Sequence, residues 1–336
     1  MAPRRLALWF ATIVAPLSAS LLNCVGDTPI TQVDAGADVA VDTATGDVAT
    51  DSPPTPDGGT DAVAPRCDKN KPFGTPVKLS LNALDVVVDS FGSMQVDPSE
   101  THAYFQKGNL VRQYDLSGTT LTHNSAIADV TVDRGFTVSP NGLEMIANRS
   151  SGPVRFTRGN TTSNWLGGTA INIAFEVPDG AVYVQFYNPS FVGNGPRFDI
   201  GRFIFYAGPS TWDIMQSDLD DAGTFVPVAQ NLHAPNVPYI NHPVPVDDTA
   251  MYFARWGVPN IVGPHLARAT RANAQAPWGT PSDVPLGSLV TTKDDSLLPY
   301  AVTPDDCALY FGYSASPDGA YSLDGPFVLY VARRPQ

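Results

Sequence analysis

Apolar and β-branched residues along this chain fall into short runs that polar turns separate. Five such runs of four or five residues each follow a turn directly, at 102–105, 143–147, 181–184, 250–253 and 308–311. Runs of this length between turn residues are typical of buried strands. The turns carry Pro, Asp, Asn and Gly, which preset or tolerate the dihedral angles of β-turns. The pattern predicts an all-β fold.

The turn-and-strand pattern repeats along the chain. The phrase PFGTP at 72–76 returns as PWGTP at 277–281, and a Tyr-Phe pair follows both copies, at 104–105 and at 310–311. When Pro98, Pro140, Pro178, Val246 and Pro304 are aligned as equivalent turn positions, they lie 42, 38, 68 and 58 residues apart. These spacings bracket the length of a four-stranded propeller blade. Residues 66–336 are therefore predicted to form a single β-propeller of five or six four-stranded blades.

The first 65 residues have two different patterns. Arg4 and Arg5 precede an apolar run over 6–22, which is the arrangement of an export signal peptide. Residues 25–65 contain eight Asp and no Lys, Arg or aromatic residue. A segment of this composition cannot bury enough apolar surface to offset its ordering entropy. We expect a signal peptide over 1–24 and a disordered tether over 25–65.

The end of the apolar run resembles the lipobox of bacterial lipoproteins, in which a cysteine receives a diacylglycerol and becomes the mature N-terminus. Leu21 stands three residues before Cys24, as in that family, whereas Asn23 replaces the usual Gly or Ala. The resemblance implies lipidation at Cys24, and Val25 after it implies the outer membrane or cell surface, with the periplasm as an alternative. Ordinary signal-peptidase cleavage near 18–20, which would leave Cys24 a thiol, is the other interpretation.

The repeat region resembles the exported proteins built from TolB-like repeats, also called PD40 or WD40-like repeats. Their Ser-Pro-Asp-Gly turn and Leu-Tyr-Phe strand match Thr-Pro-Asp-Asp at 303–306 and Leu-Tyr-Phe at 309–311, and a later strand matches at 212–215 and 329–333. The order of signal, acidic tether and propeller is similar to that of myxobacterial-type lipoproteins. The resemblance implies a propeller fold, with six blades as the common number, and implies no particular activity.

The two ends of the repeat region complement each other. The chain ends on the first half of a phrase whose second half, PFGTP, opens the region at 72–76. We therefore expect the N-terminal segment to supply the outer strand of the last blade, which closes the ring and removes open sheet edges. Cys67 and Cys307 would both lie in that blade. In an exported protein they are expected to form a disulfide, the alternative being two buried free thiols.

Composition and charge exclude some functions. Gly and Pro together number 59, and only 16% of residues are charged, which suits many short strands joined by tight turns. The net charge of −13 gives no electrostatic support to nucleic-acid binding.

No catalytic constellation is recognisable in the sequence. The five histidines form no metal-binding pair, no Gly-x-Ser-x-Gly nucleophile turn is present, and the segment 218–225 matches the Asp-box of sialidases only in part. We expect no catalytic site, metal or cofactor, and the ligand-binding residues stay unknown. The expected role is binding or scaffolding at the cell envelope, with a protein or glycan partner and a lipid anchor as the sole membrane contact. The alternative is a secreted glycosidase-like propeller that uses carboxylates facing the channel.

Overall fold

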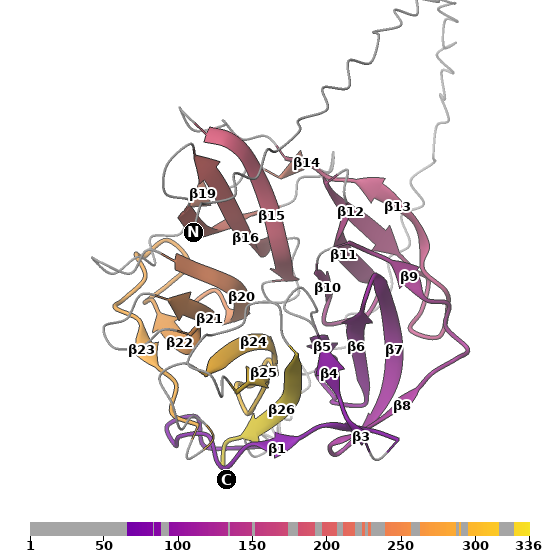
Figure 1. Cartoon of the computed structure of the whole chain (residues 1–336), viewed down its shortest axis with the longest axis horizontal. Coiled ribbons are helices and arrows are strands. Elements are labelled where there is room, and N and C mark those ends of the chain that lie inside the picture. The colour runs from indigo at the N-terminus through magenta and orange to yellow at the C-terminus, as the bar shows by residue number, and fades with distance from the viewer. Residues whose placement is uncertain are drawn as a thin grey trace, which may run out of the picture. The chain divides into compact units, whose positions relative to one another are not determined.

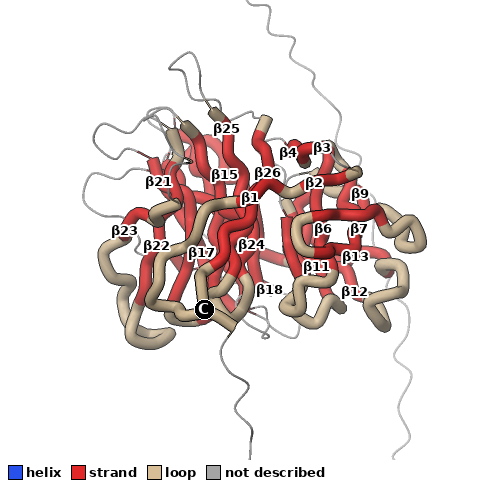
Figure 2. The backbone as a smooth tube through the Cα atoms, turned by 90° about the horizontal axis from the view of Figure 1, so that it is seen from below, coloured by secondary structure: helices blue, strands red, loops and turns tan. Residues whose placement is uncertain are grey.

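Five mainly antiparallel sheets of four or more strands form the described part of the protein (Figure 1). The structure is a computed structural model that describes residues 66–336 apart from 83, 89–93, 134, 150–151, 174–180, 192–196, 207–210, 219–223, 226–227, 230–238, 257–262, 287–288, 290–294 and 316–325. All the regular elements in these residues are strands, as Figure 2 shows. No helix among them is long and apolar enough to cross a bilayer.

The sheets follow one another as the blades of a β-propeller. Each blade contains four main strands, which run from the innermost to the outermost in this order: blade 1, β5 (Met94–Val96), β6 (His102–Lys107), β7 (Leu110–Ser117) and β8 (Thr120–His123); blade 2, β10 (Phe136–Val138), β11 (Glu144–Arg149), β12 (Gly152–Thr157) and β13 (Leu166–Ala170); blade 3, β15 (Ala181–Phe191), β16 (Arg197–Tyr206), β17 (Thr211–Asp218) and β19 (Val228–Ala229); blade 4, β20 (Tyr239–Asp247), β21 (Ala250–Trp256), β22 (His265–Thr270) and β23 (Ser282–Asp283); blade 5, β24 (Ser296–Val302), β25 (Ala308–Ser314), β26 (Phe327–Arg333) and β1 (Val77–Lys78).

Short strands supplement these blades. In blade 1, β9 (Val130–Thr131) pairs with β7, and β2 (Ser80–Leu81) lies outside β8 with β3 (Leu84–Asp85) beside it. In blade 5, β4 (Val87–Val88) also pairs with β26. Outside the five blades, β14 (Asn172–Ile173) forms a separate small sheet with β18 (Thr224–Phe225).

The five innermost strands close a ring. Each of β5, β10, β15 and β20 contacts the innermost strand of the next blade, and β24 of blade 5 contacts β5 of blade 1. The predicted propeller is confirmed, and its described blades number five of the five or six expected. Second strands such as β6 and β11 are buried along most of their length because neighbouring blades cover both of their faces.

The hydrophobic core consists of layers between blades. One cluster joins Leu79, Phe105 and Tyr310 between blades 5 and 1, and another joins Tyr104, Phe136 and Phe156 between blades 1 and 2. Three further clusters lie between blades 2 and 3, 3 and 4, and 4 and 5. Because each blade buries apolar side chains on two sides, the ring is held by apolar burial all the way around.

The N-terminal segment completes blade 5, as the repeat predicts. Val77 in β1 pairs with Val331 in β26, and the preceding Gly74 N–H donates to the Arg333 carbonyl at 2.8 Å. The same bond recurs in blade 4, where Gly279 N–H donates to the Thr270 carbonyl at 2.8 Å. The two copies of the Pro-aromatic-Gly-Thr-Pro phrase therefore have one structural role, although one of them comes from the opposite end of the chain.

One sequence alignment is wrong. The run that starts at Ala181 is the innermost strand β15 of blade 3, not a second strand, so Pro178 is not equivalent to Pro98. The second strand of blade 3 is β16, which lies inside the unusually long 68-residue interval. Pro-Asp-Gly turns suit any sharp reversal, and they do not distinguish the turn within a blade from the connection that enters it.

Candidate functional site

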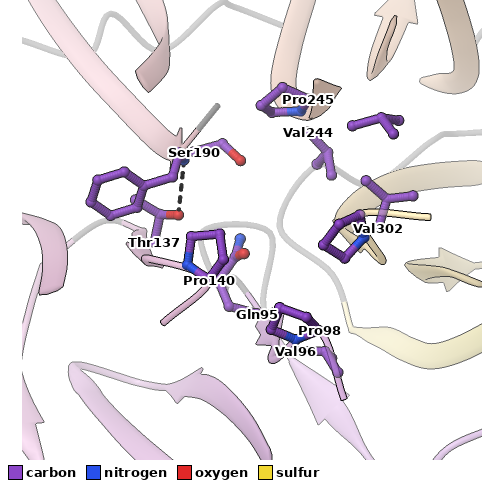
Figure 3. Close-up of a pocket in the computed structure, with 12 residues that line it drawn as sticks. Gln95, Val96, Pro98, Thr137, Pro140, Ser190, Val244, Pro245 and Val302 are labelled. Carbon is purple, nitrogen blue, oxygen red and sulfur yellow. Dashed lines mark hydrogen bonds between the residues drawn. The ribbon is translucent and has the colours of Figure 1, made fainter. Parts of the chain in front are cut away.

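A cavity of about 230 Å³ opens where the innermost strands of all five blades come together (Figure 3). We call it the axial cavity. The residues that line it are Gln95, Val96, Pro98, Thr137, Pro140, Ser190, Phe191, Val244, Pro245, Val246, Val302 and Pro304. They belong to the ends of β5, β10, β15, β20 and β24 or to the turns that follow these strands. The cavity is therefore a product of ring closure, because no single blade contains it.

The turns at the rim share one local construction. A side-chain oxygen at the first position, Asp97, Ser139 or Thr303, accepts a backbone N–H from the start of the second strand, at 2.6 to 2.9 Å. The fourth position has a left-handed backbone, with φ of 54° at Glu100 and 56° at Asp306. Proline at the second position presets the turn and leaves an apolar ring at the rim.

These turn bonds set the acidity of Asp97. Burial by itself would raise its pKa, but hydrogen bonds from Ser99, from the His102 backbone and from Thr101 outweigh burial and lower the pKa. Asp97 is thus a carboxylate that holds its own turn, which is a structural role.

Three neutral polar side chains face the axial cavity. Gln95 donates its Nε2 to the Tyr300 carbonyl at 3.0 Å, and Thr137 Oγ1 accepts the Phe191 backbone N–H at 3.2 Å. Ser190 is 4% exposed, and Figure 3 shows its hydroxyl oxygen directed into the cavity. The described lining contains no acidic, basic, cysteine or histidine side chain. The arrangement provides hydrogen bonds and apolar contact, and the described lining holds no ionisable side chain beside the two hydroxyl groups.

Several buried ionisable side chains lie between neighbouring blades instead. We call the contact between two neighbouring blades a seam and name it by the two blade numbers. In seam 1/2, Arg158 of blade 2 donates to the Tyr104 hydroxyl at 2.7 Å, to Gln113 Oε1 at 2.9 Å and to the Gly142 carbonyl at 2.6 Å. Its guanidinium also lies 4.2 Å from the centre of the Trp165 ring. Arg158 is 4% exposed, so it joins two blades from inside the protein.

Seam 4/5 repeats this geometry with different partners. Arg334 donates to the Tyr252 hydroxyl and to the Asp306 carbonyl, both at 2.9 Å, and lies 4.1 Å from the centre of the Phe73 ring. The Asp306 carboxylate accepts from the Tyr252 hydroxyl at 2.7 Å and from Arg268 at 3.0 Å. Burial first, and then the Asp306 charge and hydrogen bond, raise the pKa of Tyr252 well above its usual value. This phenol therefore acts as a neutral donor.

A third copy joins blades 3 and 4. Arg271 donates to the Asp248 carbonyl at 2.5 Å and to Gln216 Oε1 at 3.2 Å, and it lies 4.3 Å from the centre of the Trp278 ring. The sequence interpretation missed these arginines. A detectable signal was present, since Arg158 and Arg271 each precede a tryptophan by seven residues.

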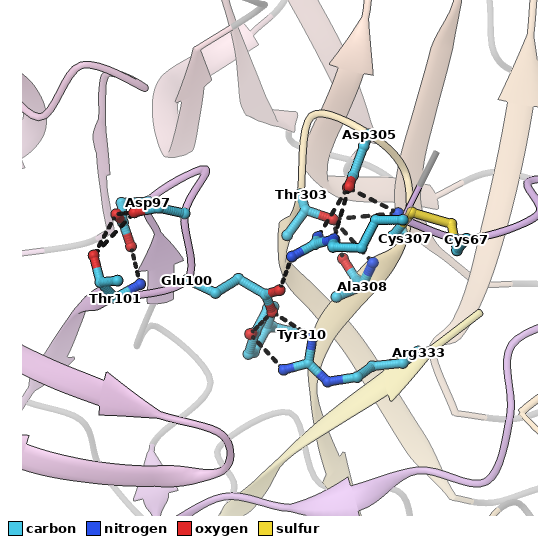
Figure 4. Close-up of polar contacts among 12 residues, drawn as sticks. Cys67, Asp97, Glu100, Thr101, Thr303, Asp305, Cys307, Ala308, Tyr310 and Arg333 are labelled. Atoms are coloured by element: carbon cyan, nitrogen blue, oxygen red, sulfur yellow. Dashed lines mark hydrogen bonds and ion pairs between the residues drawn. A yellow bond between two sulfur atoms is a disulfide. The ribbon is translucent and has the colours of Figure 1, made fainter. Parts of the chain in front are cut away.

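The predicted cysteine pair lies in blade 5, beside the seam between blades 5 and 1 (Figure 4). Cys67 and Cys307 are joined by a disulfide, which was expected for the blade that closes the ring. Beside it, Arg66 bonds Glu100 and Asp305, and Glu100 also accepts from the Tyr310 hydroxyl and from Arg333. Burial and the Glu100 hydrogen bond raise the pKa of Tyr310. Residues from both chain ends thus converge on one turn of blade 1.

The remaining predicted site features have separate outcomes. Cys24, the signal peptide over 1–24 and the tether over 25–65 lie outside the described residues. Among the described residues, the structure contains no group of three or more His, Cys, Asp or Glu side chains that could hold a metal ion. His102 and His123 lie on blade 1 beside aspartates, and His242 is buried against the Tyr300 ring.

No family model matches the sequence, and no curated protein matches it either. Solved structures resemble its fold. A protein described as a TolB from Agrobacterium tumefaciens is 13% identical with a TM-score of 0.40, covering 75% of this chain and 91% of that one. The catalytic domain of a GH62 α-L-arabinofuranosidase from Coprinopsis cinerea is 10% identical with a TM-score of 0.46, covering 78% and 96%. MPT-4, a mannose phosphorylase from Leishmania mexicana, is 11% identical with a TM-score of 0.44, covering 79% and 89%.

These likenesses concern the fold alone and carry no argument about ligand or reaction. They include a structure described as a TolB. The PD40 repeat and the myxobacterial type of lipoprotein stay predictions.

Proposed function

We propose that this protein is an exported, lipid-anchored β-propeller that binds or scaffolds another molecule of the cell envelope and has no catalytic site. The observation that carries the proposal is the lining of the axial cavity, which is apolar and neutral-polar in all of its described residues. Such a lining can recognise a ligand but lacks the ionisable pair that most hydrolytic mechanisms require.

The partners of two buried carboxylates support binding over glycoside hydrolysis. A glycosidase needs two carboxyl groups about 5 to 9.5 Å apart on either side of the scissile bond. Asp306, whose side chain is 2% exposed, is occupied by Tyr252, Arg268 and Arg334. Glu100, whose side chain is 10% exposed, is occupied by Arg66 and Arg333. Carboxylates with such partners hold blades together and are not available to a substrate.

The proposed location of the protein is inferred from its first residues. Two arginines, an apolar run and Cys24 support export and attachment of a diacylglycerol, and the segment 25–65 would separate the propeller from the lipid. The proposed location is the outer membrane or cell surface. The partner is an envelope protein or glycan, and the net charge of −13 argues against nucleic acid.

The anchor is tested by expressing the full chain and its Cys24→Ala variant in a Gram-negative host. We expect the wild-type protein in the membrane fraction with an intact mass that includes a diacylglyceryl group, and the variant in the soluble exported fraction. Identical masses and fractionation of the two proteins would refute the anchor.

Binding and catalysis are separated on one preparation of the oxidised full chain. We expect saturable binding to a defined envelope glycan or purified envelope protein in surface plasmon resonance, without release of aryl-glycoside chromophores. The matched control is the same protein unfolded by heat and reductant. Turnover of a glycoside that persists after repurification, and that substitution of one carboxylate abolishes, would establish the enzyme instead.

A further inference from the structure

Ser190 is the most informative residue of the axial cavity. It stands near the end of β15, is 4% exposed, and directs its hydroxyl into the cavity beside Thr137 (Figure 3). The Thr137 oxygen already accepts the Phe191 backbone N–H at 3.2 Å. Among the described residues, none forms a hydrogen bond with the Ser190 hydroxyl. The Ser190 hydroxyl oxygen opens to the cavity, so a water molecule or a ligand inside the cavity is its hydrogen-bond partner.

Gln95 provides a second polar group, from the innermost strand of blade 1. Its Nε2 is held by the Tyr300 carbonyl of blade 5 at 3.0 Å, which fixes the plane of the amide. The Oε1 atom has no partner among the described side chains and backbone groups, and it is available as an acceptor. Ser190 and Gln95 therefore offer one hydroxyl and one carbonyl oxygen to a ligand, held by different blades.

The rest of the lining is apolar. Four proline rings, at 98, 140, 245 and 304, stand around the cavity with Val96, Val244, Val246 and Val302. A charged ligand would lose its hydration here and gain no counter-charge, since the described lining has no ionisable group. A neutral ligand with apolar carbon loses nothing comparable, and it gains contact with the proline and valine surfaces.

We propose that the axial cavity is a binding site for a small neutral molecule that combines an apolar ring or short chain with one hydroxyl or carbonyl group. The volume of about 230 Å³ would hold roughly seven or eight waters, and so a molecule of about that many non-hydrogen atoms or slightly more. The hydroxyl or carbonyl bonds Ser190 and Gln95, and the carbon part lies against the prolines. This inference goes beyond the proposed function, because it assigns the cavity a small-molecule ligand in addition to the envelope partner.

The test uses benzyl alcohol as the neutral probe, and benzoate and benzylammonium as charged probes of nearly the same shape. Saturation-transfer NMR is recorded on the oxidised full chain at pH 7. We expect transfer to benzyl alcohol, and at least tenfold weaker binding of both charged probes. Equal binding of the three probes, or no transfer to benzyl alcohol, overturns the proposal.

Ser190→Ala tests the hydroxyl with little change in packing. We expect the affinity for benzyl alcohol to fall about three- to tenfold, as expected for one lost hydrogen bond in a desolvated site. Ser117→Ala, on the exposed end of β7, is the matched control and is expected to bind as the wild type does. Ser190→Leu fills the cavity and is expected to abolish saturation transfer to benzyl alcohol. The thermal unfolding of Ser190→Ala is expected to stay cooperative. Equal affinity in all of these variants contradicts the assignment.

The two proposals fail separately. If the wild type binds its envelope partner but no neutral probe, the cavity assignment falls and the envelope-binding role stands. If benzyl alcohol binds in a manner that depends on Ser190 and no envelope partner binds, the cavity assignment stands and the envelope role falls.

Discussion

Seams 1/2 and 4/5 are built to one plan but differ in charge. Each has an arginine that bonds a tyrosine of the preceding blade and covers an aromatic ring. Seam 4/5 has Asp306 and Arg268 at the positions where seam 1/2 has Gly142 and Gln113. The single arginine of seam 1/2 is satisfied by neutral acceptors, whereas seam 4/5 surrounds a buried carboxylate with two guanidinium groups.

The two seams also differ in the sequence separation between the arginine and the aromatic ring that it covers. Trp165 follows Arg158 by seven residues, whereas Phe73 precedes Arg334 by 261 residues. A contact between residues close in sequence costs little loop entropy, and a contact between chain ends costs more. Ring closure therefore recreates, between residues far apart in sequence, a contact that seam 1/2 makes between residues close in sequence. The additional charges and the disulfide occur where the sequence separation is large.

Loss of the disulfide is expected to have the largest effect. Cys67 and Cys307 close a loop with a sequence separation of 240, so replacing both with Ser should lower the free energy of unfolding by roughly 5 kcal/mol in the chain-entropy model. Chemical denaturation of the wild type with and without reductant, and of the double variant, measures this. Reductant should destabilise only the wild type. An unchanged wild-type midpoint in reductant would show that closure does not depend on the bond.

Removal of the seam arginines gives the next largest effect and separates the two seams. Arg334→Ala should cost about 3–5 kcal/mol, because it removes one of the two cations around a buried carboxylate. Arg158→Ala should cost about 2 kcal/mol, since it leaves only neutral acceptors unpaired. Denaturant midpoints of the two variants test the difference.

A control isolates the contribution of charge in seam 4/5. Asp306→Asn should cost less stability in the Arg334→Ala background than in the wild type, because one guanidinium group then loses its anion and not two. Equal costs of Asp306→Asn in the two backgrounds, together with equal costs for the two arginines, would refute the charge argument.

Replacing the stacked rings is expected to have a smaller effect. Phe73→Leu should cost about 1 kcal/mol, because it keeps most of the buried volume and loses the stacking of Arg334 on the ring. Trp165→Leu should cost a similar amount, since Arg158 lies at nearly the same distance from its ring. Thermal unfolding of both variants shows whether their losses of stability are equal. A much larger loss for Phe73→Leu would mean that the ring, not the arginine, holds the chain end.

Acid sensitivity is the smallest expected effect. For Asp97, Asp247 and Asp305, burial is outweighed by hydrogen bonds within their turns, joined at Asp305 by the Arg66 guanidinium, and the pKa of each is lowered. A lowered pKa in the folded state means that the unfolded chain takes up protons first as pH falls. Stability is thus fully present above about pH 5 and declines below about pH 4. Unfolding at a series of pH values checks this, with Asp97→Asn showing a shallower decline than the wild type.

The fold was largely predictable, and the reasons are local. Turn residues and short apolar runs marked most second strands, and the repeated phrase at 72–76 and 277–281 predicted both the closure and the disulfide. Blade 3 was misaligned because the turn before Ala181 has the same chemistry as the turns within blades. The site could not be predicted in the same way. Gln95, Ser190 and Val302 converge only when five inner strands meet, and no spacing along the chain encodes that meeting.

Under the proposed N-terminal anchor, the disulfide has a mechanical consequence. Tension that enters at residue 66 reaches Cys67 first and passes into blade 5 through a covalent bond. Without that bond, the same pull would act on the hydrogen bonds from Asp68 and Gly74 to the C-terminal segment, and then on the two-residue ladder between β1 and β26. The disulfide therefore lies at the point where force from the N-terminal segment enters the propeller. Such a force can reorient the ring without unfolding blade 5.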